Sequence, residues 1–177
     1  MKLHIGGREA KEGWKILDVD RRPEVDFVGS CVDLGQFPDN SIAELYASHV
    51  IEHLSFKGEL QAALKEFHRV LEPGGKCRLA VPDFETLCQM FVRPDLKLQQ
   101  RFEIMQVVFG GQNTPHDFHR VGLSFALLGV FLRDAGFVEI RRVSGFGLFH
   151  DSSEMAFLHP ALSSTPISLN VEALKPR

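Results

Sequence analysis

Four short apolar segments follow one another closely at the start of the chain, at residues 2–7, 14–20, 25–31 and 44–49. Runs of this length that stop at glycine or at a polar residue are typical of buried parallel strands. Only seven residues, 8–14, separate the glycine pair of the first segment from the body of the second. A parallel crossover with its helix normally takes about a dozen residues or more. We therefore expect a parallel sheet in which the first crossover helix is reduced or absent.

Helix and strand signals alternate through the rest of the chain. Residues 58–71 place apolar side chains at the spacing of an amphipathic helix and end at E-P-G-G, which predicts the clearest helix. Four elements are expected after it: a strand at 76–83, a helical stretch at 85–109 interrupted at Pro94, a helix from Ser124 to Ala135, and a strand at 137–143. Residues 167–174 then alternate apolar and polar side chains, as an edge or antiparallel strand does.

The charge balance argues against nucleic acid and membrane partners. The 177 residues have the length of one domain, 1–177, and carry 20 lysines and arginines against 23 acidic residues, for a net charge of −3. The sequence has no basic run or polybasic tail, so neither a phosphate backbone nor an anionic membrane is expected to attract the chain. We expect a small-molecule or carbohydrate-like partner, and the sequence makes no prediction of the oligomeric state.

Cysteine usage bears on the compartment. Cys31, Cys77 and Cys88 make an odd number and form no C-x-x-C pair, which indicates reduced thiols. No stretch approaches the about 18 apolar residues of a membrane span. The first residues also lack the charged-then-apolar pattern of a leader. The sequence therefore predicts a cytoplasmic protein.

The order of these segments resembles class I S-adenosylmethionine-dependent methyltransferases. It is most similar to the small type 11 members, in which V-I-E-H-L, R-V-L-E-P-G-G and A-G-F recur in this order. The likeness runs from Lys2 to about Pro176. It implies an α/β, Rossmann-like fold: a mostly parallel seven-stranded sheet with an antiparallel last strand and a shortened first crossover, in a single methyltransferase-like domain over 1–177.

The resemblance also implies which residues bind the cofactor, S-adenosyl-L-methionine. They are Ile5, Gly6, Gly7, Asp20, Asp33, Leu34, Ser48 and His49. Independently, a ligand with a sulfonium cation and a ribose diol but no phosphate favours carboxylates and close backbone approach. Asp20, Asp33 and Asp83 all follow predicted strands, at the edge where open parallel sheets bind ligands. A dinucleotide site would instead need G-x-G-x-x-G, and the chain has only Gly6-Gly7 here.

The candidate catalytic residues lie in the loop at 110–122 and at the end of the fourth strand. They are His49, His116, Asp117 and His119. A carboxylate next to imidazoles in one loop could orient a general base. Methyl transfer needs such a base only when the acceptor is a hydroxyl, because the transfer itself depends mainly on in-line positioning. His4 alternates with apolar residues in the first strand and is assigned no role.

His49, Glu52 and His53 spell H-x-x-E-H, a pattern of one class of zinc proteases. On a helix the two histidines would share a face and hold a metal. The turn signal before residue 44 and the helix signal after residue 53 favour a strand end instead. A metal held at the strand mouth by these residues, joined by His116 or His119, is a further alternative. We predict no metal ligands.

The leading prediction is an S-adenosylmethionine-dependent methyltransferase that acts on a small or carbohydrate-like acceptor. One alternative is a methyltransferase fold that has lost catalysis and acts as a binding or scaffold protein, because the glycine loop is thin. Another is a metal-dependent hydrolase that uses the H-x-x-E-H stretch.

Overall fold

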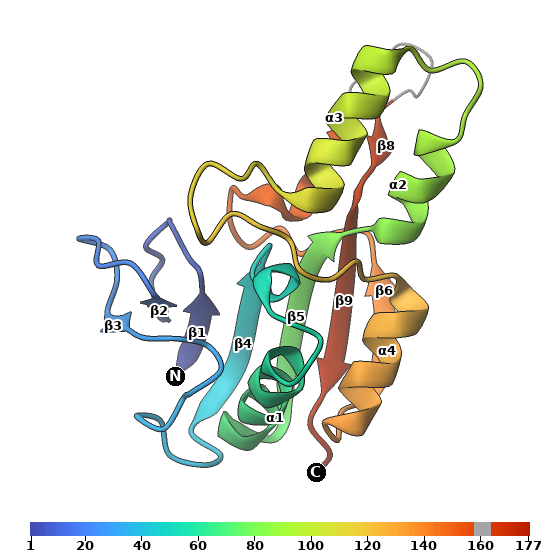
Figure 1. The fold of residues 1–177 in the computed structure, drawn as a ribbon. Helices are drawn as coiled ribbons and strands as arrows, with labels where there is room; N and C mark the ends of the chain where they lie inside the picture. The colour runs from blue at the N-terminus through green and yellow to red at the C-terminus, as the bar shows by residue number, and fades with distance from the viewer. Residues whose placement is uncertain (158–163) are drawn as a thin grey trace.

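The computed structural model describes residues 1–157 and 164–177. A seven-stranded sheet with the order β3-β2-β1-β4-β5-β9-β6 forms its centre (Figure 1). The strands are β1 (Lys2–Ile5), β2 (Trp14–Asp18), β3 (Phe27–Val28), β4 (Ile42–Ser48), β5 (Leu71–Pro82), β6 (Val138–Val143) and β9 (Ser168–Leu174). Only β9 runs antiparallel to its neighbours in this sheet, so the predicted Rossmann-like fold is confirmed. However, β9 lies inside the sheet, between β5 and β6.

No helix separates β1 from β2 in the described residues, as the short spacing predicts. The chain leaves β1 at Ile5, turns through residues 6–13 and re-enters the sheet at Trp14. The two strands pair in parallel with Lys2 opposite Trp14. The crossover is therefore a bare loop.

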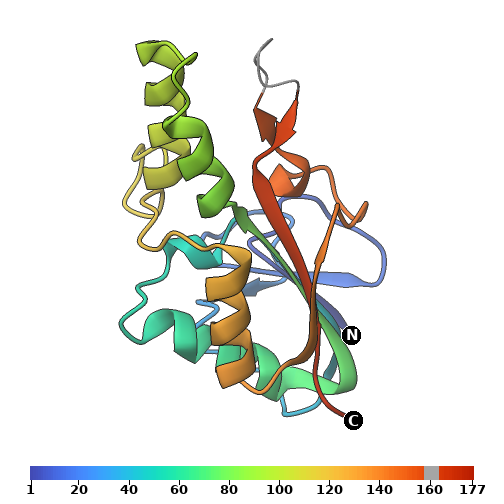
Figure 2. The same cartoon turned by 90° about the vertical axis from the view of Figure 1, so that its right-hand side faces the viewer.

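The helices gather on one face of the sheet and above its upper edge. They are η1 (Ile51–His53), α1 (Glu59–Val70), α2 (Phe84–Phe91), α3 (Leu98–Phe109), α4 (Phe125–Asp134) and η2 (Ser152–Glu154). In Figure 2, α1 and α4 lie on the same side of the sheet. The apolar stripe of α1, which includes Leu60, Leu64 and Phe67, is fully buried against the core. Ser124 caps α4, accepting a hydrogen bond from the Leu127 amide at 3.3 Å, as predicted.

A second, smaller core lies beyond the carboxyl end of β5, where α2 and α3 stand in Figure 1. Buried side chains of both helices pack there with the small hairpin of β7 (Ala156–Phe157) and β8 (Thr165–Pro166) and with Ile167. Residues 92–97, which include Pro94, separate α2 from α3, so the predicted interruption is present. Within 1–157 and 164–177, no helix is long and apolar enough to cross a membrane.

The face of the sheet opposite α1 is covered near β1 by an aromatic cluster. The ring centroid of Phe149 lies 4.1 Å from that of His4, 5.3 Å from Trp14 and 5.4 Å from Tyr46. Lys11, in the bare crossover, donates a hydrogen bond to the Leu148 carbonyl at 2.5 Å. Residues 146–150 therefore occupy the position next to β1 and β2 that a crossover helix would fill.

Below this cluster, the same face carries charges of alternating sign on five neighbouring strands. In sheet order from β1 to β6 they are Lys2, Glu44, Arg78, Glu172 and Arg141. Lys2 lies 2.8 Å from Glu44, and Nε of Arg78 lies 3.0 Å from Glu172. Arg78 also pairs with Glu44, and Arg141 with Glu172. In the part of the chain that the structure describes, no helix covers this row, and the ion pairs let the face remain partly hydrated.

Replacing Phe149 with alanine should destabilise the domain by about 3 to 5 kcal/mol, because the side chain is 7% exposed and fills the aromatic cluster. Chemical denaturation measures this loss. The matched control is Phe56→Ala, since Phe56 is 51% exposed and its removal should change stability by no more than about 0.5 kcal/mol. Equal stabilities of the two variants would show that residues 146–150 do not support the sheet.

Burial of His4 should make stability depend on pH. Burial lowers the pKa of His4 from 6.5 to about 4, although the nearby Asp151 and Glu9 act in the opposite direction. Between these two pKa values the unfolded chain binds more protons than the folded one, so stability should fall as pH drops from about 6.5 to about 4. The His4 contribution is about 3 kcal/mol. Denaturation across this window should show a smaller pH dependence for His4→Phe; an unchanged slope would contradict the assignment.

Candidate active site

A broad cavity of about 1410 Å³ opens at the carboxyl ends of β1, β2 and β4. Residues 110, 111 and 115–120 of one loop and residues 150–152, 154 and 155 of another segment complete its wall. Eight predicted site residues line it: Ile5, Gly6, Asp20, Ser48, His49, His116, Asp117 and His119. The cavity therefore brings together most of the residues that the sequence singled out.

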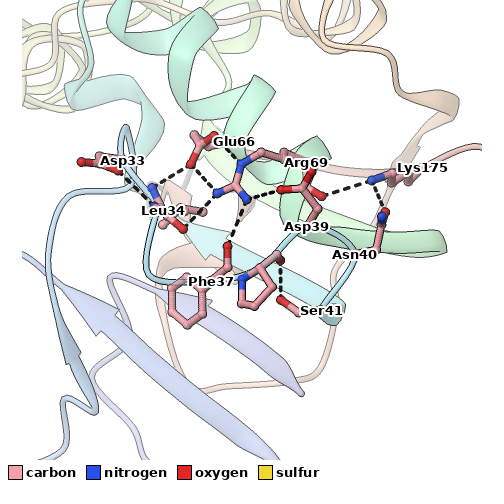
Figure 3. A network of polar contacts seen from close by, with 11 residues as sticks. Asp33, Leu34, Phe37, Asp39, Asn40, Ser41, Glu66, Arg69 and Lys175 are labelled. Carbon is pink, nitrogen blue, oxygen red and sulfur yellow. Dashed lines mark hydrogen bonds and ion pairs between the residues drawn. The ribbon is translucent and has the colours of Figure 1, made fainter.

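Three predicted residues, Gly7, Asp33 and Leu34, are not among the residues that line this cavity. Asp33 lies beside a separate, smaller pocket, and Leu34 is fully buried in the core. Figure 3 shows how the chain around Leu34 is bound to α1. The Leu34 amide donates to Glu66 at 2.9 Å, and Arg69 donates to the Leu34 carbonyl at 3.0 Å. These contacts fix the segment against the helix.

The glycine pair after β1 is required by close contacts. Gly6 has a φ of +72°, and a Cβ there would lie 2.6 Å from Cγ2 of Val50. A Cβ on Gly7 would lie 2.6 Å from Nδ1 of His4. The Gly6 amide donates to the Leu17 carbonyl at 2.8 Å, which ties the turn to β2. Any larger residue at either position would displace the wall of the cavity.

Arg22 braces this turn where a helix would otherwise stand. Its guanidinium donates to the Gly7 carbonyl at 2.8 Å, to Asp18 at 3.0 Å and to Glu24 at 2.7 Å. The hydrogen bonds that Arg22 donates to both carboxylates raise the pKa of Arg22, so its charge is held permanently. Asp18 also accepts a hydrogen bond from the Asp20 amide at 2.8 Å. This arrangement leaves the exposed Asp20 carboxylate facing the cavity.

The wall of the cavity carries more negative than positive charge. Seven carboxylates line it: Asp18, Asp20, Glu59, Glu103, Asp117, Asp151 and Glu154. Only three guanidiniums, of Arg8, Arg22 and Arg120, oppose them. Such a cavity favours a cationic ligand over a phosphate. Asp83, another acid at a strand end, instead caps α2 and pairs with Arg142.

The H-x-x-E-H stretch does not form the α-helix that the protease motif needs. β4 ends at Ser48, His49 has a φ of +53°, and the next residues form only the short turn η1. Nε2 of His49 lies 3.1 Å from Oγ of Ser168, whose own proton goes to the Ser152 carbonyl. Nε2 of His49 must therefore carry a proton and donate a hydrogen bond to Oγ of Ser168. A non-glycine residue with positive φ at a strand mouth is a backbone conformation common at functional sites.

The loop at 110–122 is docked on η1 through backbone contacts. The amides of Arg120 and Val121 both donate to the Glu52 carbonyl, at 2.7 Å and 3.3 Å. The His119 amide donates to the Phe109 carbonyl at 3.1 Å. His119 is therefore fixed on both sides and lies next to η1.

Asp117 helps to close this loop. Its carboxylate accepts hydrogen bonds from the amide and the side chain of Asn113, both at 3.2 Å, and these lower the pKa of Asp117. The group that orients the His119 ring is the Val107 carbonyl, 2.9 Å from Nδ1. Burial lowers the pKa of His119, with Glu52 opposing the effect. Among the predicted catalytic residues of this loop, His119 is therefore the one whose imidazole is held neutral by burial. His116 is exposed.

Sequence reasoning missed several residues of this wall, including Asp18, Arg22 and Asp151. Asp18 and Asp20 both belong to the D-V-D that ends the second strand, so the spacing did not distinguish the strand-end acid from its neighbour. Asp151 accepts a hydrogen bond from the Tyr46 hydroxyl at 2.7 Å, across 105 residues of sequence. No local signal marks such a long-range pair.

The strand order and the cavity at the carboxyl ends of the central strands define a class I methyltransferase fold. Residues 10–79 match the model of a family described as a methyltransferase domain, so the resemblance to type 11 methyltransferases is confirmed. A search of curated proteins finds no match to the chain.

Solved structures share the fold at low sequence identity. A possible histamine N-methyltransferase of Thermotoga maritima is 18% identical, with a TM-score of 0.62 over 98% of this chain and 81% of that one. A methyltransferase of Archaeoglobus fulgidus is 13% identical, with a TM-score of 0.61 over 98% and 85% of the two chains. A possible exported protein of Bordetella parapertussis is 14% identical, with a TM-score of 0.57 over 99% of this chain. The chain spans 62% of that protein's length.

The histidine contacts predict the ring tautomers. His53 and His119 each place Nδ1 next to a backbone carbonyl, at 3.2 Å and 2.9 Å, so each should carry its proton on Nδ1 at mildly alkaline pH. Long-range ¹⁵N–¹H correlation spectra distinguish the two nitrogens, and exposed His116 is the reference. Protons found on Nε2 of both rings would contradict the arrangement.

Proposed function

We propose that the chain is an S-adenosylmethionine-dependent methyltransferase that acts on a small or carbohydrate-like acceptor. One observation carries the proposal: the sterically required Gly6 turn and the exposed Asp20 carboxylate border the same acidic cavity. The match of residues 10–79 to a methyltransferase domain supports it independently.

The residues present fit the cofactor. Gly6 lines the cavity without a side chain of its own, which permits close backbone approach. Asp20 offers a free carboxylate to a ribose diol, and the excess of carboxylates complements a sulfonium cation. When bound, the cofactor supplies an electrophilic methyl group. Ile5, Ser48 and His49 would border it from the ends of β1 and β4.

The cavity has room for a donor and an acceptor together. Its volume exceeds the roughly 300 to 1000 Å³ typical of a site for one small ligand. The acceptor side is formed by His49 and by His116, Asp117 and His119 of the docked loop. These residues position the acceptor, and His119, with its free Nε2, is the candidate base for a hydroxyl.

A reducing compartment fits the cysteines. Cys31, Cys77 and Cys88 are all free. Burial raises the pKa of the Cys31 thiol to about 12, which keeps it protonated and unreactive. We therefore assign the reaction to the cytoplasm.

Calorimetry with S-adenosylhomocysteine tests the cofactor assignment. The wild-type chain should bind, and Asp20→Ala should weaken binding by about 1.5 to 3 kcal/mol, because a charge-assisted hydrogen bond is lost. Its fold should be unchanged, since Asp20 is exposed. Glu12→Ala is the matched control, an exposed carboxylate outside the cavity whose loss should leave affinity unaltered. Equal affinities for wild type and Asp20→Ala would remove Asp20 from the site.

A second candidate function is a methyltransferase-fold binding protein without catalysis. The bare crossover at residues 6–13 favours it, because the usual glycine loop and helix are replaced by one glycine pair and Arg22. The same titration separates the two candidates. No heat with S-adenosylhomocysteine or S-adenosylmethionine at high micromolar concentration would favour the binding protein.

A further inference from the structure

We propose that Glu52, His53 and His119 form a binding site for a divalent transition metal ion, such as Zn²⁺, in the wall of the cavity. One ligand atom of each residue lies within 4.8 Å of those of the other two. Ligand atoms around a tetrahedral metal with bonds of about 2.1 Å lie about 3.4 Å apart. To bind a metal, each pair of ligand atoms would have to come closer by no more than about 1.4 Å, the difference between these two distances. This assignment departs from the sequence prediction of no metal ligands.

The Glu52 carboxylate is a buried group that lacks the partners it needs. The residue is 1% exposed, and neither carboxylate oxygen has a hydrogen-bond partner. Nδ1 of His49 lies 3.2 Å from Oε1, but the contact does not have hydrogen-bond geometry. Buried carboxylates are normally paired or bound to a metal, because an isolated buried charge is costly. A cation between Glu52 and the imidazoles would balance the charge of this carboxylate.

Both imidazoles make the backbone hydrogen bond that metal-bound histidines usually make. His53 and His119 donate from Nδ1 to the carbonyls of Phe118 and Val107, which leaves the Nε2 lone pair of each ring free. Metal-bound histidines almost always donate their other ring proton to a carbonyl or a carboxylate in this way. The two rings lie against each other with centroids 4.8 Å apart.

The backbone joins the two segments that supply the ligands. Glu52 and His53 belong to η1, and His119 belongs to the loop at 110–122. The Glu52 carbonyl accepts from the two amides that directly follow His119, at 2.7 Å and 3.3 Å. These bonds preserve the distance between Glu52 and His119 whether or not a metal is bound.

The ligand set indicates the class of metal and its use. Two imidazoles and one carboxylate suit Zn²⁺, Co²⁺ or Fe²⁺, whereas Mg²⁺ and Ca²⁺ prefer oxygen ligands. Three protein ligands leave a coordination position open, and His53 and His119 both line the cavity. Resting on the proposed function, this open position would bind and polarise the acceptor, for example a hydroxyl oxygen. The metal would then activate that hydroxyl in place of His119, whose Nε2 it occupies.

Metal titration tests the site directly. Purified protein is dialysed against a chelator and titrated with Zn²⁺ by calorimetry and with Co²⁺ by visible absorbance. We expect one equivalent per chain and a tetrahedral or five-coordinate Co²⁺ spectrum. Losing a group that only orients a metal ligand typically weakens metal affinity roughly 10- to 100-fold. Glu52→Gln and His119→Ala change a ligand itself, so each should weaken Zn²⁺ binding by more than about 100-fold.

The matched control is His150→Ala, which removes an exposed histidine that lines the same cavity outside the cluster. Its Zn²⁺ affinity should equal that of wild type. His53→Ala provides a third ligand variant on a half-buried side chain, should either of the others fail to fold. No stoichiometric binding by wild type, or equal affinity in folded ligand variants, would overturn the metal site.

Separate titrations distinguish this proposal from the proposed function. Zn²⁺ binding without S-adenosylhomocysteine binding would support the metal site and contradict the methyltransferase assignment. S-adenosylhomocysteine binding without Zn²⁺ binding would support the methyltransferase assignment and overturn the metal site. If both hold, Zn²⁺ should leave the affinity of Asp20→Ala for S-adenosylhomocysteine as weak as before, since Asp20 is not a metal ligand.

Discussion

The short link between β1 and β2 is the constraint on which the rest of the structure depends. Residues 6–13 turn directly from one strand into the next, so no crossover helix covers this part of the sheet. A parallel sheet normally has helices on both faces, because its strands are apolar on both sides. Here the uncovered face holds an aromatic cluster around His4 and Phe149 and, below it, a row of ion pairs across five strands. The chain has replaced a helix with a distant loop and with charges that tolerate water.

The same constraint shapes the cavity. In a fold with a long crossover, a helix would hold the glycine turn in place; here one side chain, Arg22, does so by bonding the Gly7 carbonyl and Asp18 together. A guanidinium fixed by two carboxylates is planar and permanently charged, which suits it to this bracing role. Arg22 thereby holds the Gly6-Gly7 turn without a helix next to it, and the cavity stays wide. The loop docked on Glu52 adds histidines to the wall of the same cavity.

Much of the fold could be predicted from periodicity and spacing, because these follow from local geometry. The apolar stripe of α1, the Ser124 cap and the missing first helix were all visible in the sequence. The place of β9 was harder to predict. Its alternating polar residues suggest a half-exposed strand, but Asn170 and Glu172 are buried. The Glu172 carboxylate pairs with Arg78 of β5 and Arg141 of β6, and the Asn170 side-chain amide donates to the Ser153 carbonyl of η2, contacts that no local pattern can reveal.

The candidate site was predictable to the extent that it lies at strand ends. Gly6, Asp20 and His49 line the cavity because parallel strands end at one edge of the sheet. Leu34 and Asp83 also follow strands, but their surroundings use them differently, through Glu66 for Leu34 and α2 for Asp83. His119 follows Glu52 by 67 positions in the sequence. Their proximity depends on how the 13-residue loop at 110–122 docks on η1, which spacing alone does not determine.

The position of β9 inside the sheet has a consequence for how the protein is made. Among residues 1–157 and 164–177, β6 pairs with the sheet only through β9, and β9 pairs with the edge of β5 that would otherwise be free. While the ribosome is still translating residues before 168, β5 exposes unpaired backbone groups and β6 has no neighbour in the sheet. Such an edge is a template for pairing with other chains. The domain therefore completes its sheet only after β9 emerges, and a nascent chain that stalls earlier presents its most aggregation-prone surface.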